Sequence, residues 1–209
     1  RFKDDHEQSA ASLQIREGNA EGLDLHFERG WVNGGTRNAM LEDAAANYLE
    51  DLAAGRKALL LASTNTDVVH LNSLIQNVRK TRGEVHEDVQ ATIARGEQCG
   101  VGDVILTRKN QRFFEKRDGT NGSVNNGDLY VVDQIHDDGS LTVREENSSI
   151  RKLLPASYVG QHVQLGYAST VHRAQGATVD VAHAVIDKSV DRAGLYVALT
   201  RGKYATKTY

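Results

Sequence analysis

Two short, almost continuous apolar runs, residues 57–62 and 179–186, constrain the fold of this chain more than any other feature. Neither run alternates apolar with polar side chains as a half-buried strand does, and both are short for a buried helix, which favours strands covered on both faces. The first run lies between a predicted helix at residues 38–54 and a second helix that follows a polar turn at residues 63–66. This succession of helix, buried strand, turn and helix predicts an α/β fold with a parallel sheet.

The middle of the chain has a different pattern, in which short strands are separated by turn signals. Asp138-Gly139 separates two alternating runs, residues 129–135 and 140–144, and this dipeptide between such runs is a strong hairpin signal. Further turn residues occur at 125–127. We therefore predict a small all-β insertion over residues 100–157 that forms a barrel of about five strands.

Shorter elements are predicted toward the two ends of the chain. Near the start, residues 4–19 are expected to form a helix, and residues 23–32 a short hairpin that turns near Gly30. Beyond the insertion the α/β pattern returns. There we expect strands at residues 162–168, 179–186 and 204–208, and helices at residues 170–175 and 191–199.

Composition excludes several classes of protein. The longest apolar run, residues 58–62, is too short to cross a bilayer, so no membrane contact is expected. Cys99 is the only cysteine, which excludes a disulfide framework and fits a reducing, cytoplasmic location. The histidines show no metal-ligand spacing with carboxylates, and no metal site is expected. The chain begins with Arg rather than Met, and we expect it to be part of a longer protein.

The stretch at residues 166–176 combines a predicted strand with a helix start that carries hydroxyl and imidazole groups. Free backbone N–H groups at a helix start favour an anion, and Thr170 and His172 can donate to phosphate oxygens. Gln175-Gly176 allows another backbone to approach closely, because glycine has no Cβ. Taken alone, the stretch is explained equally well as a polar helix cap.

The stretch at residues 195–203 places Arg201 at the end of a predicted helix. The guanidinium fork pairs with phosphate oxygens, and an arginine in such a place can stabilise the charge that develops on a γ-phosphate during hydrolysis. Taken alone, an arginine at a helix C-terminus is more often a partner of the helix dipole. The net charge of −3 gives no whole-chain signature of a nucleic-acid binder.

Together, the two stretches resemble motifs V and VI of superfamily 1 DNA helicases. The pattern T-x-H-x-x-Q-G followed by V-A-L-T-R is similar to the branch that contains the RecD-like helicases and the helicase parts of conjugative relaxases of the TraA/TraI/TrwC type. Residues 13–18 resemble motif IV of these helicases. Residues 62–65, followed by Leu71-Asn72, resemble the strand-to-helix turn that touches the DNA backbone, and residues 102–110 and 126–128 resemble an inserted SH3-like barrel.

The resemblance implies a RecA-like second motor domain, of the P-loop NTPase type. This domain would be discontinuous over residues 1–99 and 158–209, with the SH3-like barrel inserted at residues 100–157. Its implied partners are single-stranded DNA and the preceding motor domain of the same chain.

The resemblance also implies roles for individual residues. Arg16 and Arg201 would act catalytically on the γ-phosphate, and Gln175 and Gly176 would complete the nucleotide contacts. Contacts to the DNA backbone are implied for Thr64, Asn65, Thr170 and His172. Within the barrel, Arg108 and Asn110 belong to a basic turn that either contacts DNA or is a solvated loop, and Phe113-Phe114 is either a core plug or a base-stacking platform.

Two signatures of ATP binding are missing from the sequence. It contains no G-x-x-x-x-G-K-[ST] loop and no Asp-Glu pair of the magnesium-holding type. We therefore expect ATP and Mg²⁺ to be held mainly by the first motor domain of the intact protein, and this fragment alone to be inactive in ATP hydrolysis. Thr178 stands where many of these helicases have a glutamate that meets the ribose.

Three parent proteins are compatible with these features. Residues 154–159 favour a plasmid-mobilisation relaxase. The alternatives are a RecD-like exonuclease V alpha subunit and a non-catalytic module that binds nucleic acid or protein and retains the fold. The residues do not decide between DNA and protein as the ligand of the barrel.

Overall fold

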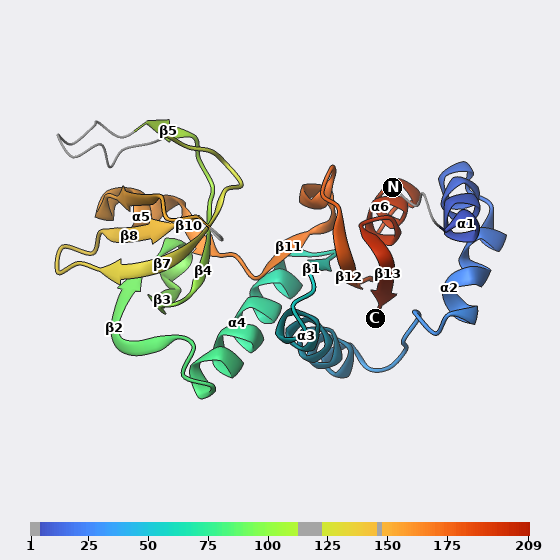
Figure 1. The fold of residues 1–209 in the computed structure, drawn as a ribbon, viewed down its shortest axis with the longest axis horizontal. Coiled ribbons are helices and arrows are strands. Elements are labelled where there is room, and N and C mark those ends of the chain that lie inside the picture. The colour runs from blue at the N-terminus through green and yellow to red at the C-terminus, as the bar shows by residue number, and fades with distance from the viewer. Residues whose placement is uncertain (1–4, 113–122, 146–147) are drawn as a thin grey trace. The chain divides into compact units, whose positions relative to one another are not determined.

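The computed structural model describes residues 5–112, 123–145 and 148–209 (Figure 1). The chain divides into two compact units, each of which is described by itself. The α/β unit comprises residues 1–75 and 168–209, and the β unit comprises residues 76–167.

A parallel sheet forms the centre of the α/β unit. Its strands are β1 (Ala58–Ala62), β11 (Ala168–Thr170), β12 (Val179–Val185) and β13 (Gly202–Thr208), in the order β11-β1-β12-β13. At the outer edge of β13, Val32 forms a parallel bridge with Thr208. Because β1 and β12 are central and covered on both faces, their sequences are nearly continuous apolar runs.

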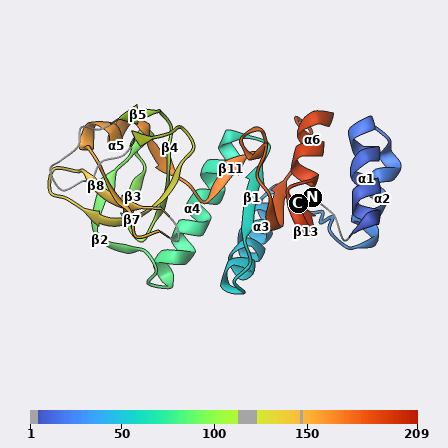
Figure 2. The ribbon, with the colours of Figure 1, turned by 45° about the horizontal axis from the view of Figure 1, so that its top comes forward.

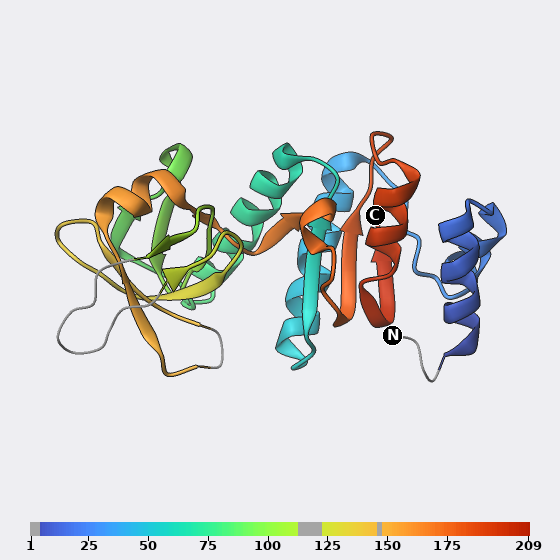
Figure 3. The same ribbon diagram turned by 90° about the horizontal axis from the view of Figure 1, so that it is seen from above.

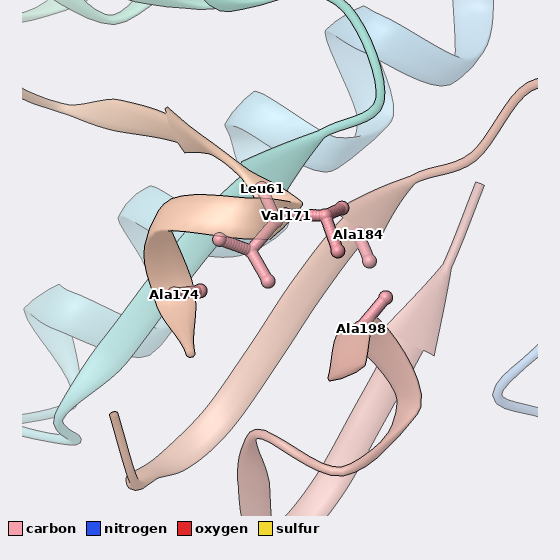
Figure 4. Close-up of a cluster of buried hydrophobic side chains, with 5 residues drawn as sticks. All are labelled: Leu61, Val171, Ala174, Ala184 and Ala198. Carbon is pink, nitrogen blue, oxygen red and sulfur yellow. The ribbon is translucent and has the colours of Figure 1, made fainter. Parts of the chain in front are cut away.

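Helices cover both faces of this sheet (Figure 3). On one face, the 3₁₀ helix η3 (Val171–Ala174) and α6 (Arg192–Leu199) pack on the strands. The contact is formed by small and branched side chains, Leu61, Val171, Ala174, Ala184 and Ala198 (Figure 4). The neighbouring strand residues Leu60 and His183 point to the opposite face, where α3 (Arg37–Ala53) lies. Four-residue spacing of buried positions on α3, such as Leu41, Ala45 and Leu49, produces this contact.

The predicted hairpin at residues 23–32 is wrong. This stretch forms a 3₁₀ turn, η1 (Ala20–Leu23), and a short helix, α2 (Asp24–Glu28), which fold back against α1 (His6–Glu17). The buried residues are Gly22 and His26, which are four positions apart as on a helix face, whereas Phe27 is exposed. A Cβ on Gly22 would lie 2.7 Å from the carbonyl oxygen of Ala11, so the close approach requires glycine.

The β unit contains a five-stranded antiparallel sheet with the order β10-β4-β7-β8-β9 (Figure 2). Its strands are β4 (Val104–Thr107), β7 (Leu129–Ile135), β8 (Leu141–Arg144), β9 (Arg151–Leu154) and β10 (Val163–Leu165). Two smaller pairs accompany it, β2 (His86–Thr92) with β3 (Gln98–Val101) and β5 (Gln111–Arg112) with β6 (Ser123–Val124). The remaining elements are η2 (Ala94–Gly96), α5 (Ala156–His162) and the end of α4 (Asn65–Thr81).

The borders of the β unit differ from the expected insertion at residues 100–157. The unit extends from residue 76 to residue 167, because the β2–β3 hairpin contacts β7, and β10 pairs with β4. The single strand expected at residues 162–168 is therefore two strands: β10 belongs to the antiparallel sheet, and β11, after Gly166-Tyr167, belongs to the parallel one. None of the described helices is both long and apolar enough to span a membrane.

A buried carboxylate organises one side of the β unit. Asp103 is fully buried and accepts hydrogen bonds from the backbone N–H of Gly100 at 2.8 Å and from Gln76 Nε2 at 2.7 Å. The hydroxyl of Tyr167 also donates to it, and burial together with this carboxylate raises the pKa of that hydroxyl. Asp103 thus joins α4, β3 and the segment that precedes β11.

A second buried network ties α3 to the parallel sheet. His183 on β12 is fully buried, with Nε2 2.8 Å from Asp51 Oδ2 and Nδ1 2.9 Å from the hydroxyl of Tyr209. Arg56 Nε donates to the other oxygen of Asp51 at 2.7 Å. Burial lowers the pKa of His183 from 6.5 to about 4, although the bond to Asp51 opposes this shift.

We predict a pH-dependent loss of stability that arises from His183. Between about pH 6.5 and pH 4 the unfolded chain binds a proton at this residue and the folded chain does not, so stability falls as the pH falls through this window. The expected loss is about 3 kcal/mol. Urea unfolding followed by the fluorescence of Trp31, the only tryptophan, measures it in the α/β unit. The variant His183→Asn should lack this part of the pH slope; an unchanged slope contradicts the assignment.

The Asp103 network gives a second prediction. Asp103→Ala leaves the three donors around the buried carboxylate without their acceptor, and it should lower the free energy of unfolding by about 3 kcal/mol. Asp137→Ala, in an exposed turn of the same unit, is the matched control and should change little. Urea unfolding followed by circular dichroism compares the two; equal effects would show that Asp103 is not a structural centre.

Candidate functional site

The residues singled out in the α/β unit lie at two opposite edges of its parallel sheet. The strand registers place Ala62 beside both Thr170 and Val185, so β11, β1 and β12 end at the same level. We call this side, where Thr170 lies, the carboxyl edge. The opposite side, the amino edge, includes the start of β12, where Val179 N–H donates to Arg201 C=O at 3.2 Å.

At the carboxyl edge, Thr64 and Asn65 follow β1 directly. The Thr64 hydroxyl accepts from Asp67 N–H at 3.1 Å and donates to its carboxylate at 2.5 Å, as a threonine does when it caps a helix. Asn65 is the first residue of α4 and is exposed. The Thr64 side chain therefore has a structural role in this state, and the backbone carbonyl oxygen of Thr64 accepts from Val68 N–H at 3.1 Å, whereas Asn65 is exposed to solvent.

Arg37 also lies at the carboxyl edge, and the sequence analysis did not select it. Its guanidinium pairs with Asp67, and a second carboxylate oxygen, on Asp187 after β12, is 4.0 Å away. The side chain remains 45% exposed. No sequence signal links Arg37 to Asp67, because thirty residues separate them and the contact depends on the α3–β1 packing.

The stretch from Thr170 to Gly176 connects the two edges. Thr170 is half-buried at the end of β11, and His172 is exposed on η3. The helix expected at residues 170–175 is a single 3₁₀ turn, so its dipole is weaker than that of the longer helix the sequence suggested. Gln175 and Gly176 are exposed beyond η3, and Gly176 has φ of 92°, which favours glycine.

Arg201 does not project from the end of α6 as expected. The residue is only 4% exposed, and Nε donates to Val197 C=O at 2.8 Å. Nη1 donates to the carbonyl oxygens of Ala174 and Ala177, each at 3.2 Å. The Thr200 hydroxyl accepts from Nη2 at 2.9 Å. The guanidinium thus fastens the loop that contains Gln175-Gly176 to α6.

Arg16 and Arg201 are not brought together in this state. Arg16 is exposed in the last turn of α1, and Gly18, two residues later, lies against the side chain of Arg192 at the start of α6. Arg201 follows the other end of α6. This eight-residue helix, roughly 12 Å long at 1.5 Å per residue, lies between Arg192, which Gly18 approaches, and Arg201.

In the β unit, the basic turn after β4 is exposed at Arg108 and Asn110. The backbone of this turn is fixed: Arg108 N–H donates to His162 C=O at 2.8 Å, and the Tyr158 hydroxyl donates to Lys109 C=O at 2.5 Å. Asn110 Oδ1 accepts from the N–H of Asn126 at 2.6 Å, which occupies part of its side chain. Phe113-Phe114 lies outside the described residues.

The chain is similar in sequence to several known proteins. No protein-family model matches the chain. It is similar to conjugal transfer protein TraA of Agrobacterium fabrum, with 29% identity over 202 residues that make up 95% of this chain and 18% of that protein. A probable conjugal transfer protein TraA of Sinorhizobium fredii is 27% identical over 195 residues, 91% of this chain and 17% of its own length. The chain thus spans less than a fifth of these relatives.

A shorter relative is also similar. An uncharacterized protein of Mycobacterium tuberculosis is 31% identical over 110 residues, which make up 53% of this chain and 61% of that protein.

Solved structures show the same fold. Pif1 helicase from Bacteroides in complex with ADP-AlF3 and ssDNA superposes with a TM-score of 0.62 and 17% identity, covering 100% of this chain and 50% of that chain. Pif1 helicase from Candida albicans gives a TM-score of 0.58 and 13% identity, covering 99% and 53%. The predicted α/β fold with a RecA-like parallel sheet is therefore confirmed.

The contacts of Arg201 predict a local effect in the isolated chain. Arg201→Ala removes the donors that hold the carbonyl oxygens of Ala174 and Ala177, so backbone amides at residues 175–178 should exchange hydrogen faster by roughly tenfold. Hydrogen–deuterium exchange measures this change. Arg16→Ala alters an exposed side chain and serves as the control; the loop amides should be unaffected. Unchanged exchange in Arg201→Ala would show that the loop is held by other contacts.

Proposed function

We propose that this chain, which is homologous to conjugal transfer protein TraA over 95% of its length, is the second motor domain of an ATP-dependent single-stranded DNA translocase or helicase. Its parent would be a plasmid-mobilisation relaxase. The observation that carries the proposal is the separation of two groups of polar residues on the RecA-like sheet. Thr64, Asn65 and Thr170, the proposed contacts to the DNA backbone, lie at the carboxyl edge of the sheet. Arg201 and the loop that it holds lie at the amino edge.

The carboxyl edge supplies the proposed track for DNA. Thr64, Asn65 and Thr170 come from two neighbouring strands whose ends are level, and His172 follows on η3. Hydroxyl, amide, imidazole and backbone N–H groups bind phosphate without reading sequence, which is what a translocase needs. Single-stranded DNA is the partner of the Bacteroides Pif1 complex, and we propose the same class of partner for this chain.

The amino edge supplies the proposed nucleotide contacts. ATP with Mg²⁺ would be held mainly by a preceding motor domain and would supply the phosphoryl group that is hydrolysed. In this chain, Gln175, Gly176 and Arg201 would face it, and Arg16 would be a second cationic contact. Arg201 must rotate away from the carbonyl oxygens of Ala174 and Ala177 to reach a γ-phosphate, so its engagement would release the loop that follows η3.

Release of this loop would couple the two edges. The same short segment carries His172 toward the proposed DNA track and Gln175-Gly176 toward the nucleotide. A change in the position of Arg201 therefore alters the packing of η3 on β1 and β12, where Val171 and Ala174 are buried. We further propose that the β unit is the SH3-like barrel of this family and that Arg108 and Asn110 contact DNA.

One observation favours a second candidate, the non-catalytic binding module. The relative from Mycobacterium tuberculosis is matched over 61% of its length by 110 residues, so that protein is far shorter than the TraA relatives. A protein of that length that contains part of this fold is too short to contain the other, ATP-binding motor domain as well. The RecD-like alternative has no counterpart among the relatives described above.

The proposal predicts the effect of Arg201→Ala in the full-length parent. Loss of an arginine finger should lower kcat for ATP hydrolysis by a factor on the order of 10³, because the charge on the γ-phosphate is no longer stabilised. The affinity for single-stranded DNA should change much less than kcat, because Arg201 itself makes no proposed contact with DNA. Steady-state ATPase assays and fluorescence anisotropy with a labelled oligonucleotide measure the two quantities.

Two comparisons complete this test. His172→Ala should weaken DNA binding and leave basal ATP hydrolysis unchanged, which is the opposite pattern. The isolated 209-residue chain should not hydrolyse ATP. A parent whose turnover survives Arg201→Ala has its finger elsewhere, and a parent without a phosphate-binding loop supports the binding module.

A further inference from the structure

A hollow of about 230 Å³ lies at the carboxyl edge of the parallel sheet, on the side of β12 and β13. Its wall is formed by Gly34 and Gly35 ahead of α3, by Arg37 and Met40 within α3, and by Ile186 and Tyr209 at the ends of the two strands. In open parallel sheets, ligands bind outside the carboxyl ends of the strands. None of the residues that line this hollow was selected from the sequence.

A chain of contacts links the wall of the hollow to Thr64 of the proposed DNA track. The Thr64 hydroxyl donates to Asp67 at 2.5 Å, Asp67 pairs with Arg37, and Arg37 lines the hollow. Strands in a sheet lie about 4.8 Å apart, so the hollow is roughly two strand spacings from Thr170 on β11. A strand whose phosphates pass Thr170 and Thr64 therefore reaches it.

The charges around Arg37 favour a neutral group over a phosphate. Arg37 contributes one positive charge, and Asp67 and Asp187 contribute two negative ones. Ser189 donates to Asp187 and holds the pKa of that carboxyl below its usual range, so it is charged at neutral pH. A phosphate entering here meets a net negative charge, whereas a planar base, thymine included, presents N–H groups from which carboxylates accept.

The interior favours the same occupant. Met40, Ile186 and the largely buried Tyr209 give an apolar wall, and the guanidinium of Arg37 lies at the opening. Bases stack on aromatic rings and on guanidinium planes with little sequence preference. Glycine at positions 34 and 35 leaves one side of the hollow without side chains.

We infer that this hollow receives one nucleobase of the single strand whose phosphates run along the carboxyl edge, and that Arg37 covers that base. The inference rests on the proposed function, because it requires single-stranded DNA at that edge. It assigns to Gly34, Gly35 and Arg37 a role that none of the motif resemblances includes.

The test compares an intact oligothymidylate with a series in which one nucleotide at a time is abasic. For the unaltered chain, one position in the series should weaken binding by roughly tenfold, since stacking of one base has this magnitude. Gly34→Leu adds a bulky side chain at the wall of the hollow, and the site accepts it because a Cβ there meets nothing within 4 Å and the backbone is not in the left-handed region. The sensitivity to that one position should then disappear, and the other positions should behave as before.

Gly160→Leu is the matched control, because it is also open around its Cβ but lies on α5 of the β unit. It should keep the full abasic profile, and urea unfolding followed by circular dichroism should show that both variants are folded. Two results would overturn the base-binding hollow and leave the proposed function intact. One is an unaltered chain that binds every abasic oligonucleotide equally well, and the other is a Gly34→Leu variant that remains sensitive to the same abasic position. A chain that binds none of the oligonucleotides overturns the proposed function together with the hollow.

Discussion

The arrangement of the α/β unit depends on a short segment that runs across its sheet from one end of the strands to the other. Between the end of β11 and the start of β12 the chain passes from the carboxyl edge to the amino edge over residues 171–178. This is possible because Ala174, Ala184 and Ala198 are small enough for η3 and α6 to lie close to the strands. Every residue proposed to touch DNA or nucleotide on this segment takes its position from that packing.

The regular elements of the α/β unit were predictable because a strand buried on both faces has an almost continuous apolar sequence. The strand at residues 58–62 and the helix at residues 37–53 agree with the expected ranges to within a residue or two. The hairpin expected at residues 23–32 is instead a turn and a short helix that carries His26. The structure buries it to 3% exposure, and its ring lies edge-on to Trp31.

Residues whose role depends on distant partners were beyond sequence reasoning. Asp103 was included only in the stretch at residues 102–110 that resembles the inserted barrel, yet its carboxylate oxygens accept from Gln76 and Tyr167. Arg37 was not noticed at all. Arg201 was selected from the sequence, but the four oxygens around it come from two distant stretches, residues 174–177 and 197–200, and no local pattern indicates that they converge.

Arg37 and Arg201 differ in what an incoming anion must displace. Arg37 faces the carboxylates of Asp67 and Asp187, so an anion that takes their place must separate existing opposite charges. Each oxygen named above as an acceptor of Arg201 is neutral, three from carbonyl groups and one from a hydroxyl. An anion that binds Arg201 exchanges neutral hydrogen-bond acceptors for a negatively charged one, and charge-assisted hydrogen bonds are the stronger kind. The guanidinium can therefore leave its present acceptors when an anion approaches, without separating an ion pair.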